Sequence, residues 1–367
     1  MLAESPPLVR RLIRFAALPY CYFKLVNWKE CPASRYQVIK DLLYIFFVLK
    51  CYPDNYSVCR LWEIDRKQWA YYYGSLYDPY QREKLRKEVQ RYEYVTLFDD
   101  KEVCEHLCRG MKGVNLPKYY GAVNPDMDYR STIEEIVNGI GDKKIIIKPA
   151  VGRAGQGIVL AYKGDDGIKI KDGDKEYDLS EFGLKERSII QEVIIQHDVI
   201  TKVSSASVNT IRVVTFYTKS NEAIVLSVNM RYGVGDNFVD NVGAGGIHVG
   251  VDFETGMLKK LAYDKRGNRM LRHPTSDIEF EGFQIPKWDD VMKMSLAVQK
   301  SCPFYKLLGL DVALTNDGPV LIEANPNPDL VFQEQGSGPL LADERVLVEF
   351  GKYDLLINDM QKDILKD

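Results

Sequence analysis

Two short apolar segments near the C-terminal end of the sequence carry acidic and amide side chains in a regular pattern. Asp311 lies in the first segment, Glu323 and Asn325 lie in the second, and the turn signal Asn316-Asp317-Gly318 separates them. In a hairpin centred on Asp317, Asp311 faces Glu323, and side chains two residues apart share a face, so Asn325 joins them. Two opposed carboxylates repel unless a cation lies between them. The pattern therefore favours a Mg²⁺ site shared with substrate phosphates over charged residues on a solvated sheet face.

A glycine-rich segment in the middle of the chain is a second candidate for chemistry. An apolar run ends at Lys148 and Pro149, and a second apolar run begins at Ile158; between them lie Gly152, Arg153, Ala154, Gly155, Gln156 and Gly157. A dinucleotide fingerprint and a P-loop both need a helix after the glycines, and here a strand follows. A glycine hairpin can still cover phosphates, with Lys148 as a fixed cation. A plain hairpin turn beside a lysine that reaches water is the alternative.

The composition of the 367-residue chain excludes several classes of protein. Its 46% hydrophobic and 28% charged residues are typical of a globular protein, and not of a disordered chain or a coiled coil. With 49 basic and 52 acidic residues, the formal charge of −3 gives no overall attraction to nucleic acid. The most apolar run, residues 42–49, is too short to cross a bilayer, and no signal peptide is recognisable. We therefore expect a cytoplasmic protein without a transmembrane segment.

The cysteine content is also typical of a cytoplasmic protein. Seven are present, an odd number, and they are scattered through a chain long enough to form its own core, so we expect free thiols. Cys104, His106 and Cys108 lie close in sequence, as some zinc ligands do. Because no second Cys/His pair completes a tetrahedral set, we interpret them as ordinary helix residues.

The hydrophobic pattern changes along the chain. Residues 1–98 have helical periodicity and little glycine, with the clearest predicted helices at 35–50 and 80–92. Further predicted helices cover residues 101–112, capped by Asp99 or Asp100, and residues 288–300. Beyond Gly141 short β-rich runs predominate, at 144–149, 158–162, 188–195, 209–217, 223–231, 247–253, 310–314 and 319–325. This segregation predicts an α+β protein with antiparallel sheets.

The order of these motifs resembles the ATP-grasp superfamily. The shared features are the lysine-ended strand, the glycine hairpin, the segment Gln191 to Ile194 and the closing Asp…Glu-x-Asn hairpin. The segments 207–213 and 239–247 are similar to its sugar-transfer-associated branch, which is met among genes for surface polysaccharides. The resemblance covers residues 99–340, with hints at 52–73. It implies two α+β subdomains that clasp ATP: residues 99–193 as the N-terminal or lid part with the glycine loop, and residues 194–367 as the catalytic part with the metal-binding hairpin. Residues 1–98 would form a helical N-terminal region.

The resemblance also implies which residues bind ATP. Two lysines contact the nucleotide in this superfamily, and Lys101 and Lys148 stand at the matching positions. The adenine would meet the backbone after the hinge strand, formed here by Gln191, Glu192, Val193 and Ile194. The ribose would meet Asp198, with His197 as the alternative. The implied metal ligands are Asp311, Glu323 and Asn325, the same three residues that the hairpin pattern selects.

Catalytic and substrate contacts follow from the same resemblance. The candidate catalytic residues are Arg212, Lys148 and Asn209. Arg212, beside Asn209 in an otherwise apolar strand, matches an arginine that touches the γ-phosphate or the acyl-phosphate; a buried structural ion pair is the alternative. Arg231, Asp240 and Asn241 are candidate substrate contacts, with ordinary loop chemistry as the alternative. His248 and His273 have no evident partner in the sequence and are interpreted as structural.

The implied reaction is activation of a carboxylate by ATP, followed by attack of an amine to form an amide. We therefore expect a carbon–nitrogen ligase that uses ATP with Mg²⁺, or alternatively Mn²⁺, on a small-molecule carboxylate and amine, sugar-linked in a surface-glycan setting. A phosphotransferase that acts on a hydroxyl group is one alternative. A nucleotide-binding regulatory protein that docks through its tyrosine-rich N-terminal region is another. Nucleic acid is not an expected partner.

Overall fold

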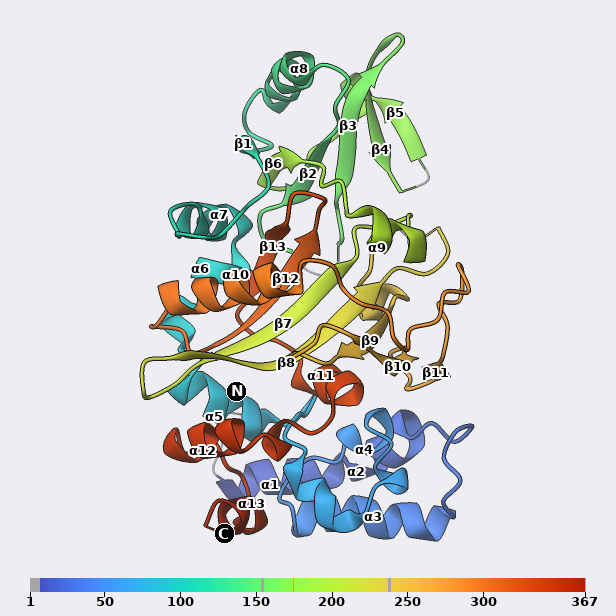
Figure 1. Cartoon of the computed structure of the whole chain (residues 1–367), viewed down its shortest axis with the longest axis vertical. Helices are drawn as coiled ribbons and strands as arrows, with labels where there is room; N and C mark the ends of the chain where they lie inside the picture. The colour runs from blue at the N-terminus through green and yellow to red at the C-terminus, as the bar shows by residue number, and fades with distance from the viewer. Residues whose placement is uncertain (1–6, 153–154, 174, 237–238, 367) are drawn as a thin grey trace.

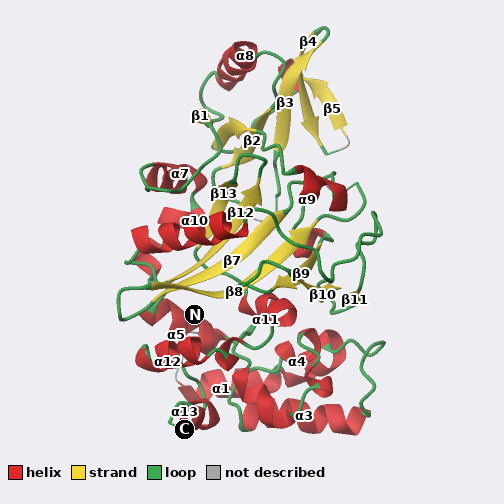
Figure 2. Cartoon of the chain, viewed as in Figure 1, coloured by secondary structure: helices red, strands yellow, loops and turns green. Residues whose placement is uncertain are grey.

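The computed structural model describes residues 7–152, 155–173, 175–236 and 239–366. The molecule has three parts along its longest axis (Figure 1). A six-stranded sheet with one helix lies at one end, a seven-stranded sheet lies in the middle, and helices from both ends of the chain form the other end (Figure 2). We call this last part the helical base.

The six-stranded sheet forms the part expected to be the lid. Its antiparallel strands are β1 (Tyr119–Val123), β2 (Ile145–Pro149), β3 (Val159–Gly164), β4 (Gly167–Asp172), β5 (Lys175–Asp178) and β6 (Ser188–Glu192), in the order β1-β6-β2-β3-β4-β5. Helix α8 (Tyr129–Ile140) packs on it through Ile133 and Val137, which share a small core with Ile145 and Ile147. The glycine-rich segment joins β2 to β3, as predicted.

The seven-stranded sheet is also antiparallel. Its strands are β7 (Thr210–Tyr217), β8 (Ala223–Tyr232), β9 (Ile247–Val251), β10 (Leu258–Tyr263), β11 (Arg269–Met270), β12 (Leu307–Leu314) and β13 (Pro319–Asn325), in the order β11-β10-β9-β8-β7-β12-β13. Helix α10 (Trp288–Ser301) covers one face. Because side chains alternate along a strand, Ile211 and Val213 belong to the core under α10, whereas Val214 and Phe216 join the core of the helical base on the opposite face.

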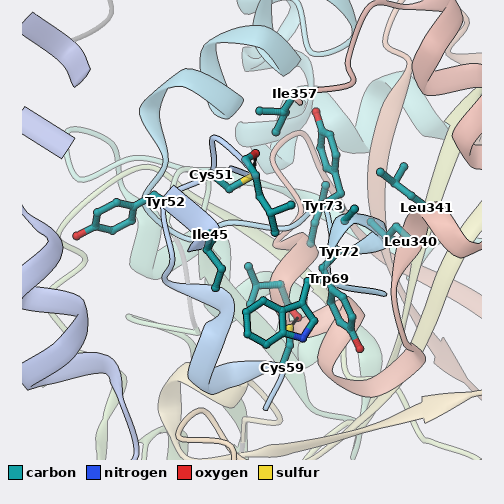
Figure 3. Close-up of a cluster of buried hydrophobic side chains, with 14 of the residues drawn as sticks. Ile45, Cys51, Tyr52, Cys59, Trp69, Tyr72, Tyr73, Leu340, Leu341 and Ile357 are labelled. Atoms are coloured by element: carbon teal, nitrogen blue, oxygen red, sulfur yellow. Dashed lines mark hydrogen bonds between the residues drawn. The ribbon is translucent and has the colours of Figure 1, made fainter. Parts of the chain in front are cut away.

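The helical base contains short helices from the N-terminal region: α1 (Pro7–Ala16), α2 (Leu18–Tyr20), α3 (Arg35–Phe47), α4 (Asn55–Val58) and α5 (Pro79–Glu88). Helices α11 (Leu330–Ser337), α12 (Glu344–Lys352) and α13 (Asp359–Ile364) complete it from the C-terminal end. Figure 3 shows the shared core, in which Ile45, Cys51 and Tyr73 meet Leu340 and Ile357. The predicted helical character of the N-terminal region is therefore correct, and its core includes buried side chains from Leu330 to Ile357. The division of the chain at residue 98 stays a prediction.

Two further helices connect the base with the lid: α6 (Thr96–Asp99) and α7 (Lys101–Arg109). Asp100 caps α7 by accepting hydrogen bonds from the backbone N–H groups of Glu102 and Val103. The predicted helices at 35–50 and 288–300 and all eight predicted strands are present, with small differences at their ends. The sequence interpretation missed α8, the helix α9 (Asp198–Val203), the C-terminal helices α11, α12 and α13, and strands β4, β5, β10 and β11. Among the described residues, no helix has the length and apolar character needed to span a bilayer.

Candidate functional site

The hairpin of β12 and β13 has the predicted register at the acidic residues. Asp311 lies opposite Glu323, and Asn325 lies opposite Gly309. A bulge between Asp311 and Val312 shifts the register toward the turn by one residue, so that Val312 faces Leu321. The turn is closed by Thr315, whose hydroxyl donates to the carbonyl of Gly318 at 2.9 Å. The prediction that Asp311 and Glu323 face one another is thus confirmed.

Asp311 is also opposite Arg212 on the neighbouring strand β7, and the two side chains form a bidentate ion pair. Nε of Arg212 donates to one carboxylate oxygen at 2.5 Å, and a terminal nitrogen donates to the other at 2.7 Å. Arg231 on β8 adds a contact of 3.3 Å. Burial alone would raise the pKa of Asp311, but the positive charges of Arg212 and Arg231 outweigh it and hold the pKa below its usual value. Both alternatives for Arg212 therefore keep support: it is in a buried ion pair, and that pair belongs to the acidic hairpin.

Two lysines approach Glu323 from the lid side of the site. Lys148 on β2 is buried, and burial lowers its pKa to about 8 although Glu323 favours its charged form. Lys101, the first residue of α7, lies 3.6 Å from Glu323 and donates a hydrogen bond to the carbonyl of Gly152 at 2.9 Å. Both lysines line a small pocket that is closed by Gln191 from β6 and by Glu323 from β13. We call this the lysine pocket.

The segment expected to meet adenine lies beside this pocket. Gln191 is buried, and its amide nitrogen donates to Glu105 at 2.7 Å, while its amide oxygen accepts no hydrogen bond from the described residues. Glu192 accepts a hydrogen bond from the backbone N–H of Lys118, and Val193 and Ile194 are half-buried just beyond the strand. The two ribose candidates lie apart from the pocket walls. Asp198 is exposed at the start of α9, and His197 caps that helix through Nδ1.

The glycine loop lies against the loop between β8 and β9. Gly155 and Gly157 have φ angles of +74° and +73°, which side-chain-bearing residues rarely adopt. A Cβ at Gly155 would lie 2.5 Å from the side chain of Val239, so this approach requires glycine. Gln156 is exposed. The predicted contact residue Arg153 lies outside the described residues.

The remaining predicted residues divide into two groups. Asp240 accepts hydrogen bonds from the backbone N–H and the hydroxyl of Thr210, at 2.7 and 2.5 Å, and it lies in the field of Arg231; burial raises its pKa. It therefore belongs to the same buried charge network as Asp311. Asn209 is used inside its own loop, where its amide donates to Ser204 at 2.7 Å and its oxygen accepts from Gly233 at 3.0 Å. Asn241 caps a short 3-10 helix by accepting from Gly243 at 2.7 Å.

The structure adds supporting residues that the sequence interpretation missed. Glu105 is buried in the wall of the lysine pocket, and Arg187 forms ion pairs with Asp100 and Glu102 at the start of α7. The spacing of Lys101 and Glu105, four residues apart on one helix, could have indicated Glu105. No local signal indicates Arg187. Cys104 and Cys108 also line this pocket, with their sulfur atoms 4.0 Å apart, whereas His106 packs against the ring of Tyr119.

The chain is similar to several solved ligase structures, at low sequence identity. A search of curated proteins finds no match to the sequence. Among solved structures, D-alanine–D-alanine ligase from Bacillus anthracis matches with 15% identity and a TM-score of 0.38 over 74% of this chain and 69% of the ligase. D-alanyl-alanine synthetase A from Vibrio cholerae matches with 10% identity and a TM-score of 0.42 over 74% of this chain and 66% of that one. VanG D-Ala:D-Ser ligase from Enterococcus faecalis matches with 13% identity and a TM-score of 0.40 over 70% of this chain and 61% of that ligase.

The family assignment rests on the sequence itself. Residues 80–346, well over half of the chain, match the family described as sugar-transfer associated ATP-grasp. The match includes both sheets, the glycine loop, the lysine pocket and the acidic hairpin. The chain belongs to the sugar-transfer-associated ATP-grasp family.

Proposed function

We propose that this protein is an ATP-dependent ligase that joins a carboxylate to an amine through an acyl-phosphate. One observation carries the proposal: two lysines of the lid side and the Asp311–Arg212 pair of the large sheet converge on Glu323. The family description supports a setting in glycan assembly, and we propose that the carboxylate or the amine is linked to a sugar.

ATP would lie between the two sheets. Lys101 and Lys148 would contact its phosphates, because a buried cation is stabilised when an anion enters beside it. The segment 191–194 would meet the adenine, and the free amide oxygen of Gln191 is an acceptor that faces this space. Gly152, Gly155, Gln156 and Gly157, together with Arg153, would cover the phosphates and exclude water from the activated acyl group. Asp198, with His197 as the alternative, remains our proposal for the ribose contact.

The acidic hairpin fits a magnesium ion. Among the described residues, no three Asp, Glu, His or Cys side chains cluster to form a metal site, so Asn325 and substrate phosphates would complete the set begun by Asp311 and Glu323. The side chain of Asn325 makes no hydrogen bond with another described residue, and an ionised carboxylate such as Asp311 has about four acceptor sites, more than its bidentate arginine uses. Mg²⁺, or alternatively Mn²⁺, would supply positive charge to the β- and γ-phosphates when bound.

The proposed reaction proceeds in two steps. A substrate carboxylate oxygen forms a bond to the γ-phosphorus of ATP, the bond to the bridging oxygen breaks, and ADP leaves. The amine nitrogen then attacks the acyl carbon, phosphate leaves, and the amine proton passes to solvent. Arg212 and Lys148 would stabilise the charge on the transferred phosphoryl group from fixed positions, with no reorganisation during the reaction. Arg231, Asp240 and Asn241 would contact the substrate, and Asn209 would hold the loop before Arg212.

A hydroxylamine trap tests this function. The protein is incubated with Mg²⁺-ATP, hydroxylamine and pools of amino acids, uronic acids and nucleotide-linked uronic acids, and hydroxamates and ADP are measured by mass spectrometry. We expect one carboxylate to give a hydroxamate, and we expect Glu323→Gln to abolish it. The matched control is Glu281→Gln, which changes an exposed glutamate paired with Lys260 and should leave the signal unchanged. ADP that forms with a phosphorylated, hydroxylamine-stable product would instead establish a kinase.

A further inference from the structure

A second pocket adjoins the charge network on the same face of the large sheet. It has a volume of about 230 Å³ and lies between α5 and the loop that follows β13; we call it the α5 pocket. One of its walls is Pro328, which covers Gly309: a Cβ at Gly309 would lie 2.7 Å from Pro328 and 3.5 Å from the side chain of Arg212. The α5 pocket therefore begins where the Arg212–Asp311 pair ends.

One side of the α5 pocket is cationic. Arg82 and Arg86 are four residues apart on α5 and both line the pocket. Arg82 donates a hydrogen bond to the carbonyl of Leu76 and forms no ion pair with a described residue. Arg86 makes neither a hydrogen bond nor an ion pair within the described part of the chain. Two guanidinium groups thus face a pocket without a protein carboxylate bound to them.

The other side of the α5 pocket is anionic. Asp329 caps α11 with a single oxygen, Oδ1, which accepts from the backbone N–H groups of Val331 at 3.0 Å and Phe332 at 3.4 Å. Its second oxygen accepts no hydrogen bond from any residue that the structure describes. Burial raises the pKa of Asp329, and the charges of Arg212 and Arg82 act against this rise, so Asp329 lies near both the charge network and the α5 arginines. The side chain of Asn327, which also lines the pocket, is without a hydrogen-bond partner among the described residues.

A pocket with a carboxylate at one end and two guanidinium groups at the other matches a small zwitterion. We propose that the α5 pocket binds the amine substrate, and that this amine is a free amino acid with its ammonium group at Asp329 and its carboxylate at Arg82 and Arg86. The inference rests on the proposed ligase function. It orients the nitrogen toward Arg212 and the acyl-phosphate, and the carboxylate of the amino acid away from them.

The test separates the two half-reactions. Hydroxylamine needs no amino-acid site, so we expect Arg86→Gln to leave the hydroxamate rate and the KM for ATP unchanged while raising the KM for the amino acid at least tenfold. The matched control is Lys87→Gln, an exposed residue on α5 outside the pocket. Asp329→Asn keeps the capping oxygen but removes the charge, and should raise the same KM. In the native protein, the amide of the amino acid should react poorly, and Arg86→Gln should remove this difference.

The other outcomes distinguish failure of the α5 pocket inference from failure of the proposed function. Hydroxamate formation with no amide product from any amino acid, or equal KM values in native protein and Arg86→Gln, would refute the α5 pocket and leave the ligase standing. If no carboxylate gives a hydroxamate, the proposed function fails. Saturation-transfer NMR with pools of amino acids then tests the pocket directly: binding lost in Arg86→Gln retains it, and no binding refutes it.

A different observation concerns the outer surface of the helical base. Of the 21 large apolar side chains that are exposed among the described residues, 12 lie between residues 8 and 48. They are Leu8, Val9, Leu12, Ile13, Phe15, Tyr20, Phe23, Tyr36, Ile39, Leu43, Phe47 and Val48, with exposures of 37–70%. Monomeric globular proteins rarely expose so many large apolar residues together.

Seven of these residues follow the faces of two neighbouring helices. Leu8, Leu12 and Phe15 follow the spacing of one face of α1, and Tyr36, Ile39, Leu43 and Phe47 follow that of one face of α3. The ring of Phe15 lies 5.9 Å from the rings of both Phe46 and Phe47, so the end of α3 contacts α1. We call this surface the basal patch; both helices lie at the end of the molecule farthest from the lid (Figure 1).

The charge of the same segment is opposite to that of the whole chain. Residues 7–50 contain eight lysines and arginines against the two acids Glu30 and Asp41, whereas the chain as a whole has a net charge of −3. Exposed apolar side chains among basic ones are the composition of helices that lie in a membrane interface. Basic residues are attracted to anionic lipid headgroups, by about 1 kcal/mol each near the surface.

From these two properties we infer that the basal patch binds the surface of an anionic lipid bilayer. In vesicle flotation, the full chain should bind vesicles that contain 30% phosphatidylglycerol and should bind pure phosphatidylcholine at least tenfold more weakly, with binding reduced by salt. Leu12→Glu combined with Phe47→Glu should abolish binding without changing the melting temperature, because both side chains are exposed. The control is Leu271→Glu, which changes an apolar side chain of similar exposure that lies outside the basal patch. Absence of binding, or a dimer in light scattering that the double variant converts to monomer, would overturn the inference.

Discussion

Buried charges gather in two regions of this molecule, and their partners differ. Around the acidic hairpin, Asp311 is held by Arg212 and Arg231, and Glu323 faces Lys101. Inside the helical base, around α11, buried carboxylates are held by neutral donors. Glu334 accepts from the backbone N–H groups of Tyr73, Gly74 and Leu340 at 2.7, 2.7 and 3.0 Å. Asp54 likewise accepts from the hydroxyl of Ser75 and from the N–H of Tyr77 at 2.6 Å.

The difference in partners distinguishes a candidate ligand site, around the hairpin, from a structural region, around Glu334 and Asp54. Neutral donors satisfy Glu334 and Asp54 so fully that no ligand is needed, yet burial still raises the pKa of each carboxyl to about 7. Around the hairpin, one cation has no partner: Lys148 is buried without an ion pair among the described residues, and burial lowers its pKa to about 8. A buried cation without a bound anion costs free energy that an incoming phosphate would recover. The region around Glu334 and Asp54 holds the fold together, whereas we expect a ligand to complete the charges around the hairpin.

Replacement of Lys148 by methionine should show the largest effect. We expect kcat to fall by about 10²–10³-fold, because a charge fixed near the phosphates is lost. The free energy of unfolding should stay the same or rise, because the buried charge is replaced by an apolar side chain of similar length. Turnover measured beside urea unfolding checks both. A variant that unfolds more easily and retains native kcat would place Lys148 among the structural residues.

Replacement of Glu334 by glutamine should show the reverse pattern. Three backbone N–H groups point at this carboxylate, and the amide NH₂ of glutamine would face at least one of them. We expect the free energy of unfolding to fall by about 1–3 kcal/mol, with kcat per folded molecule unchanged. The matched control is the exposed Glu281→Gln, which should change neither quantity. Loss of kcat at native stability would erase the distinction between the two regions.

The sequence allowed prediction of the parts of the site that depend on local order. The pairing of Asp311 with Glu323 follows from a turn signal and a count of residues, and the strand-to-strand glycine loop follows from the runs on either side. The charge partners could not be predicted in this way. Arg212 is 99 residues from Asp311, and Glu334 is 261 residues from Tyr73, and such pairs exist only once the sheet and the base have assembled.

Missed elements have a similar cause. Strands β4 and β5 carry Lys, Asp and Glu on exposed faces at the edge of the lid, so their apolar alternation is too weak to indicate strands. The core shared by Ile45 and Ile357 could not be inferred from either segment, because each has only one part of it. The helical character of residues 1–98 was predictable, whereas their closure by the C-terminal helices was not.

The third expected effect is a dependence of the free energy of unfolding on pH, which comes from the buried carboxyls of the helical base. The pKa of Asp54 is 3.8 in the reference state and about 7 in the folded protein, so folding favours its protonated form. Below pH 4 the carboxyl is protonated in both states, so its burial costs no ionisation free energy. Between pH 4 and 7 only the unfolded state loses its proton readily, so the free energy of unfolding falls as pH rises, and above pH 7 the loss is complete.

Asp54→Asn cannot ionise, and it should make the fall in unfolding free energy between pH 5 and pH 8 smaller than in the native protein. Glu334 has the same direction of shift, so some slope should remain in the single variant. Urea titrations at the two pH values measure the slope, and Asp126→Asn on the exposed surface of the lid part is the control with native behaviour. An unchanged slope would mean that the buried carboxylates of the helical base are ionised in the folded protein. The helical base would then hold buried charges as the hairpin does, and the two regions would differ only in the partners of those charges.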